Sequence, residues 1–104
     1  MKLTEIADVI RSKNSGPYEL TFDVIFKTRE LYERMCAKNI INKESFAALY
    51  NIPVKNVMEV VNFDPAGAIK VTIVRPIASG AFGESDVYGA QQHAPLMSME
   101  VDLS

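Results

Sequence analysis

The stretch LTFDVIF occupies residues 20–26, and every second side chain in it is large and apolar. The apolar side chains of this alternation are Leu20, Phe22, Val24 and Phe26. A period of two is typical of a β-strand that buries one face, so the stretch predicts a central strand of a sheet. Asp23 lies on the opposite face, between Thr21 and Ile25. There its carboxylate can face solvent, pair with Arg11 or Lys13, or line a cleft.

The segment before this strand has a different period. Its apolar residues recur at i, i+3, i+4 and i+7, and they are Leu3, Ile6, Ala7 and Ile10. This spacing places four side chains on one stripe of a helix, so we expect a helix over residues 3–11. The run RSKNSGP at residues 11–17 ends that helix with turn-forming residues, and Pro17 disfavours helix at the residue before it.

Two amphipathic helices are expected after the strand. Thr28 is a suitable N-cap for RELYERMCAKN at residues 29–39, where apolar and charged side chains fall on opposite faces. The apolar face of this helix consists of Leu31, Tyr32, Met35 and Cys36. Asn42 is a suitable N-cap for a shorter helix. The buried side of the shorter helix consists of Phe46, Leu49 and Tyr50.

The second half of the chain is expected to form three more strands. Residues 57–63 and 69–74 are apolar stretches that predict a strand pair, and they are separated by Asp64, Pro65, Ala66, Gly67 and Ala68. Residues 97–103 alternate apolar with polar side chains and predict a last strand. The resulting order is typical of an α+β two-layer sandwich with helices on one face of a mainly antiparallel sheet. Within that class we expect a ferredoxin-like arrangement.

Length and composition indicate one domain. The chain has 104 residues, of which 48% are hydrophobic and 23% are charged. A chain of this length can bury one core but not two, so residues 1–104 are expected to form a single domain. Eleven Lys and Arg residues oppose thirteen Asp and Glu residues, which gives a formal net charge of -2. An overall negative charge does not favour binding to nucleic acid.

Cysteine content and hydropathy exclude other classes of protein. The single cysteine, Cys36, excludes an intramolecular disulfide and any multi-cysteine metal site. On the apolar side of a helix it is expected to be a small buried side chain rather than a nucleophile. No apolar run approaches the roughly 20 residues that cross a bilayer, and the first residues lack a signal-peptide core. We expect a cytoplasmic protein with no membrane association and no metal site.

Three stretches of the chain resemble a known family. They are VIRSKNSGPYELTFDVIF at residues 9–26, FDPAGAIKVTIVRP at residues 63–76 and SDVYGAQQHAPL at residues 85–96. The pattern is similar to that of a small bacterial and archaeal family of domains of unknown function, encoded beside or fused to acyclic terpene utilisation proteins of the AtuA type. The resemblance implies a small ferredoxin-fold domain that works with a larger AtuA-type catalytic partner in the breakdown of carboxylic acids or their thioesters.

The run RSKN supplies a candidate anion-binding site. It combines two cations with a hydroxyl and an amide, in Arg11, Ser12, Lys13 and Asn14. Such groups can hold a carboxylate or a phosphate, the arginine in a bidentate manner and the lysine as a point charge. The alternative is that cations at the end of a helix only complement its dipole. Arg75 follows the strand over 69–74 and is either a second anion clamp or an exposed strand-end arginine.

The sequence between Val74 and Pro95 has no clear period, and loops of this length in small domains are often functional. Its segment SDVYGAQQHAP groups five polar or titratable side chains, which are Asp86, Tyr88, Gln91, Gln92 and His93. His93 is the candidate general acid or base, because histidine titrates near neutral pH, and Asp86 can orient it. Tyr88 and the two glutamines are candidate ligand-binding residues. The alternative is that these side chains only hold the loop together by hydrogen bonds.

These residues leave three functions open. The first is a small accessory or site-completing subunit that docks on an AtuA-type protein and contributes a polar, anion-binding cleft. The second is an independent, homo-oligomeric lyase, hydratase or isomerase that uses His93 as acid or base on a small carboxylate or acyl thioester. The third is a helix-turn-helix DNA binder over residues 45–61, with Lys55 and Asn56 on the DNA. Pro53 and the negative net charge oppose the third function.

Overall fold

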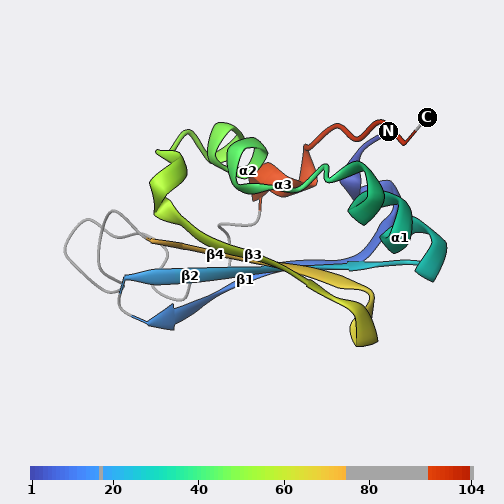
Figure 1. Cartoon of the computed structure of the whole chain (residues 1–104), viewed down its shortest axis with the longest axis horizontal. Helices are drawn as coiled ribbons and strands as arrows, with labels where there is room; N and C mark the ends of the chain where they lie inside the picture. Colours follow the sequence, from blue (N-terminus) through green and yellow to red (C-terminus); the bar gives the residue numbers. More distant parts are fainter. Residues whose placement is uncertain (17, 75–93, 104) are drawn as a thin grey trace.

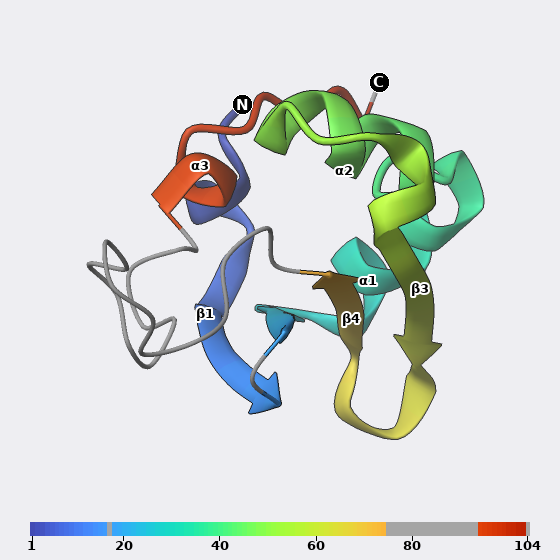
Figure 2. The same ribbon diagram turned by 90° about the vertical axis from the view of Figure 1, so that its left-hand side faces the viewer.

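The chain forms a four-stranded antiparallel sheet with a layer of helices on one of its faces (Figure 1). The structure is a computed structural model that describes residues 1–16, 18–74 and 94–103. Its strands are β1 (Ala7–Gly16), β2 (Glu19–Phe26), β3 (Val57–Phe63) and β4 (Ala68–Val74). Their order across the sheet is β1, β2, β4, β3, so β1 and β3 are the edge strands (Figure 2). The predicted strands over residues 20–26, 57–63 and 69–74 are confirmed.

The helices are α1 (Arg29–Lys38), α2 (Lys43–Tyr50) and the short α3 (Ala94–Met97). The first two begin at the predicted N-caps. The Thr28 hydroxyl accepts a hydrogen bond from the backbone N–H of Leu31 at 3.1 Å. The Asn42 side chain accepts from the backbone N–H of Ser45 at 2.7 Å, and the Ser45 hydroxyl accepts in return from the Asn42 N–H at 3.0 Å. These bonds satisfy N–H groups that a helix leaves unpaired at its start.

Asparagine residues also end both helices. Asn39 follows α1 and Asn51 follows α2, and their φ angles of 50° and 55° lie in the left-handed region. Asparagine occupies this region at a lower cost than most residues other than glycine. The left-handed residue turns the chain away from the helix axis and lets its N–H bond to the last carbonyls. Local chemistry at both ends therefore defines the length of each helix.

The cap at Asn42 is testable by substitution. Asn42→Ala removes the side-chain acceptor of the N-cap and is expected to lower the free energy of unfolding by about 1 kcal/mol. Urea denaturation at neutral pH measures the change. Asn62→Ala is the matched control, because Asn62 is an exposed asparagine on β3, and its effect is expected to stay within about 0.5 kcal/mol. Equal losses in the two variants would contradict the assigned role of the cap.

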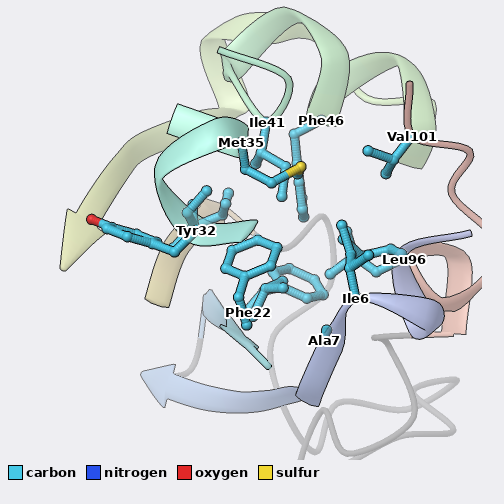
Figure 3. Packing of buried hydrophobic residues seen from close by; sticks show 14 of the residues in the cluster. Ile6, Ala7, Phe22, Tyr32, Met35, Ile41, Phe46, Leu96 and Val101 are labelled. Carbon is cyan, nitrogen blue, oxygen red and sulfur yellow. The ribbon is translucent and has the colours of Figure 1, made fainter. Parts of the chain in front are cut away.

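The core lies between the helix-facing side of the sheet and the helices (Figure 3). Phe22 of β2 contacts Phe46 of α2 edge to face, with 4.9 Å between ring centroids, and the Tyr50 ring lies 5.0 Å from Phe22. Met35 of α1 and Leu96 of α3 are fully buried in the same cluster. The alternating apolar side chains of residues 20–26 thus form the floor of the core.

The predicted helix over residues 3–11 is wrong. Only Leu3–Glu5 form a single 3₁₀ turn, and Ala7–Gly16 form β1, which pairs with β2 as an antiparallel hairpin. The residues RSKNSG therefore lie within a strand rather than in a turn. Leu3, Ile6 and Ala7 are nevertheless buried, because the turn and the start of the strand contact the same core. Pairing with β2 satisfies the backbone of this segment and overrides its weak helical pattern.

The predicted last strand over residues 97–103 is also wrong. Its first residue ends α3, and the segment that follows has one isolated antiparallel bridge, between Lys2 and Glu100. Val101 is buried, and its N–H donates to the carbonyl of Met1 at 2.7 Å. The alternation of apolar and polar residues over 97–103 therefore shows that one side of this segment is buried. A strand also needs a partner that pairs with it along its length. Here the pairing is with the short segment before the 3₁₀ turn, which is not long enough to make a strand.

The element order confirms the α+β class and the position of the helices on one face. Both longer helices lie in the connection between β2 and β3, whereas a ferredoxin-like fold has the order β-α-β-β-α-β. The ferredoxin-like detail is therefore not established by this order. Strand β3 occupies the residues that a second helix of a helix-turn-helix would need, which opposes the DNA-binding alternative. Among the described residues, no helix has the length and apolar character needed to span a membrane.

Candidate functional site

Three predicted site residues lie on the outer face of the sheet, which is the face opposite the helices. The strand register arranges the side chains of this face in three rows. In the order β1, β2, β4, β3, the first row is Lys13, Thr21, Thr72 and Glu59. The second row is Arg11, Asp23, Lys70 and Val61, and the third is Val9, Ile25, Ala68 and Phe63. The outer face is thus polar in two rows and apolar in the third.

An ion pair joins Arg11 to Asp23 in the second row. The Nε atom of Arg11 donates to Oδ2 of Asp23 at 3.0 Å. The Asp23 side chain is only 3% exposed, whereas the Arg11 side chain is 57% exposed. The buried carboxylate therefore holds the Nε atom of Arg11, while the rest of the guanidinium remains at the surface. This arrangement restricts the guanidinium while leaving it accessible to a second anion.

The carboxylate of Asp23 is incompletely satisfied. Its Oδ1 atom is buried and has no hydrogen-bond partner in the part of the chain that the structure describes. Lys70 is the cross-strand neighbour of Asp23 on β4, but its ammonium group lies over the Phe63 ring, 5.3 Å from the ring centroid. A buried carboxylate oxygen without a partner is costly, so this position has capacity for one more donor or cation.

Strand alternation separates the four residues of the RSKN run. Arg11 and Lys13 belong to the outer face. Ser12 and Asn14 pair with core residues of β2 and belong to the helix-facing side, where Ser12 is buried. The structure therefore brings Arg11 together with Asp23, but it does not place all four side chains of the run in one cluster. The expected single anion site of two cations, a hydroxyl and an amide is divided between two faces.

Strand pairing brings two candidate segments to one end of the sheet, which we call the hairpin end. Glu19 at the start of β2 pairs with Gly16 at the end of β1 and with Val74 at the end of β4. The turn that follows RSKN and the last residue of β4 therefore lie at the same end of the sheet. Tyr18 in the hairpin is exposed. The remaining predicted site residues lie outside the described residues and are Arg75, Asp86, Tyr88, Gln91, Gln92 and His93.

A second polar cluster, not predicted from the sequence, lies between α1 and the turn that joins β3 to β4. The Tyr32 hydroxyl donates a hydrogen bond to the carboxylate of Asp64, and the Arg29 guanidinium lies over the Tyr32 ring. Burial of the phenol and this hydrogen bond raise the pKa of Tyr32 above its ordinary range, so the hydroxyl remains protonated. A hollow of about 430 Å³ lies beside this cluster, with Cys36 and Asn62 in its lining. Tyr32 and Asp64 are 32 residues apart, so no local pattern could have revealed the contact.

Within the described ranges, no group of three or more His, Cys, Asp or Glu side chains is arranged to hold a metal ion. The chemistry at these positions is instead that of hydrogen bonds and ion pairs. The described residues thus define a small α+β domain with a charged sheet face opposite the helices and a hairpin end where the turn between β1 and β2 lies beside the end of β4.

The chain belongs to the family described as domain of unknown function (DUF4387), which matches residues 3–100. Neither the curated proteins nor the solved structures contain a match to this chain. The family match confirms the expected membership of a small family of domains of unknown function. The match covers β1 to β4 and extends through α3, so it includes both the outer face and the hairpin end.

Proposed function

We propose that the chain is a small accessory or site-completing subunit of a larger catabolic protein of the AtuA type. In this function the subunit contributes a polar cleft that binds a carboxylate or an acyl thioester. The resemblance of residues 9–26, 63–76 and 85–96 to AtuA-associated domains motivates the choice of partner. We assign the subunit to the cytoplasm, as the sequence predicts.

The observation that supports this proposal is that the turn after RSKN and the end of β4 lie at the same end of the sheet. The hairpin after RSKN and the chain leading into residues 75–93 leave the sheet beside Glu19, although they are about sixty residues apart in sequence. Exposed loops carried by a rigid sheet are a common place for binding residues.

The chemistry of Arg11 fits an anionic ligand or an acidic partner surface. Its guanidinium is held by the buried Asp23, which reduces the conformational freedom lost when the exposed part binds another carboxylate. Lys13 lies two residues further along the same face of β1 and adds a second cation. Arginine and lysine arranged in this way bind carboxylates and phosphates through charge-assisted hydrogen bonds.

Affinity capture tests the proposal. The tagged chain is expected to retain an AtuA-type protein in a stoichiometric complex, measured by mass spectrometry and by sizing of the complex. Tyr18→Ala is expected to weaken capture about tenfold or more, because an exposed tyrosine is a frequent anchor of protein interfaces. Tyr18 is 58% exposed in the hairpin.

Met97→Ala is the matched control, because it removes an exposed large side chain from α3 rather than from the hairpin end. Capture is expected to be unchanged in this variant. Failure to retain an AtuA-type protein, or equal capture by the Tyr18 variant and the parent chain, would refute the proposed function. Turnover of carboxylates or acyl thioesters by the purified chain alone, lost in His93→Ala, would instead support the independent enzyme.

A further inference from the structure

The outer face of the sheet has the features of a contact surface. All described helices lie on the other side of the sheet (Figure 1). Val61 is 39% exposed and Phe63 is 44% exposed on β3, while Val9 on β1 and Ile25 on β2 are half-buried. Charged side chains of the first and second rows border these apolar residues. Exposed apolar groups bordered by charge often mark a surface that another macromolecule covers.

We propose that this face binds a second copy of the chain to form a symmetric dimer. The proposal does not depend on the proposed function, although Arg11 and Lys13 of the outer face take part in both. Two identical faces that pack against each other are related by a two-fold axis lying in the plane between them. That axis can run along the strands or across them, and the charges of the outer face distinguish the two cases.

An axis along the strands, between β2 and β4, places β1 over β3 of the second copy and keeps the rows level. Lys13 then lies opposite Glu59 of the second copy, and Asp23 lies opposite Lys70 of the second copy. In the third row, Val9 lies opposite Phe63 of the second copy. Each of these contacts occurs twice by symmetry, so opposite charges meet at Lys13 and Glu59 and apolar side chains meet at Val9 and Phe63, whereas Arg11 lies opposite Val61 of the second copy.

An axis across the strands, through the second row, gives the opposite result. Each side chain of that row then faces the same residue of the second copy, so Arg11 meets Arg11, Asp23 meets Asp23 and Lys70 meets Lys70. Like charges directly opposite one another are unfavourable. The charges therefore select the axis along the strands.

The size of the face indicates a concentration-dependent dimer. Four strands spaced about 4.8 Å apart and paired over about six residues give a flat footprint of roughly 400 Å² per copy. Stable interfaces generally bury about 800 Å² per partner, so this face belongs with the smaller and weaker ones. We therefore expect monomers in dilute solution and dimers at higher concentration.

Sedimentation velocity over a range of concentrations tests the dimer, with paired charge reversals testing its symmetry. Lys13→Glu and Glu59→Lys each place like charges opposite one another twice, and each is expected to weaken self-association about tenfold or more. A mixture of the two variants is expected to recover dimers, because a mixed dimer restores opposite charges at both contacts. Lys27→Glu and Glu33→Lys are exposed controls outside the outer face and are expected to dimerise like the parent chain.

Three results would overturn the proposal. The first is a parent chain that stays monomeric up to about 1 mM, well above the dissociation constant of weak specific dimers. The second is a dimer that neither charge reversal weakens, which would place the interface elsewhere on the molecule. The third is weakened self-association in both single variants without recovery in their mixture, which would exclude the axis along the strands. Circular dichroism of each variant distinguishes loss of contact from loss of folding.

Discussion

Phe22→Ala is expected to lower the free energy of unfolding by about 3–5 kcal/mol. Phe22 is fully buried at the centre of β2, where its ring contacts Phe46 and Tyr50 of α2. Alanine removes the apolar surface of the ring and leaves a cavity between the sheet and the helices. A single domain is generally stable by only about 5–15 kcal/mol, so the variant is expected to lose a large fraction of its stability.

Urea denaturation followed by circular dichroism measures this loss. Phe22→Leu retains most of the apolar volume and is expected to lose much less stability than the alanine variant. Met58→Ala is the surface control, because Met58 is an exposed apolar residue on the edge strand β3. A loss below about 1 kcal/mol for Phe22→Ala would contradict the assignment of this side chain to the core.

Arg11→Ala is expected to lower the free energy of unfolding by about 2 kcal/mol, because it leaves the buried carboxylate of Asp23 without its cation. Removing one partner from a fully buried ion pair destabilises a protein more than this. Arg11 is exposed, so the expected loss of stability here is smaller. Water can solvate the outer part of the arginine in both the folded and the unfolded state. The main cost therefore falls on Asp23, whose side chain is almost fully buried.

A double-mutant cycle isolates this interaction. Asp23→Asn removes the charge with little change of shape, and in that background Arg11→Ala is expected to cost about 1–2 kcal/mol less than in the parent chain. Lys13→Ala is the control for loss of a cation from the same face of β1, with an expected effect within about 0.5 kcal/mol. Additive effects of the Arg11 and Asp23 changes would show that the two side chains do not interact in solution.

The two proposals overlap at Arg11 and Lys13, because both cations lie on the outer face, so anion binding by these side chains would compete with the dimer. A dimer through the outer face would leave the hairpin end of each copy open, because that end lies where the strands leave the sheet. If both proposals hold, one dimer would present two hairpin ends to two larger partners. Sizing of the captured complex would then give two copies of each protein.

Local chemistry was sufficient to predict the helices after β2 and the strands on either side of them. The caps at Thr28 and Asn42 are hydrogen bonds within three residues, so the sequence alone contains every group that makes them. The alternation of Leu20–Phe26 likewise needed no knowledge of the partner strands. The same reasoning failed at residues 3–11, where strand pairing with β2 prevailed over a helical spacing.

The candidate site was predictable only in part. Arg11, Lys13 and Asp23 were identified from the sequence, and pairing of Asp23 with Arg11 was one of the alternatives considered. The alternation that places Ser12 and Asn14 on the other face follows once residues 7–16 form a strand. The pair of Tyr32 and Asp64 was missed, because it depends on the position of α1 relative to the turn after β3.

The sequence by itself determined the α+β class, the caps of the two longer helices and the apolar face of β2, because these depend on groups close together along the chain. The tertiary structure alone decided which cation meets Asp23, which charges share a row of the outer face and which strand ends meet at the hairpin end. Those relations depend on the register between strands. A shift of one residue in that register would move every side chain to the other face, so the choice depends on packing of the whole core.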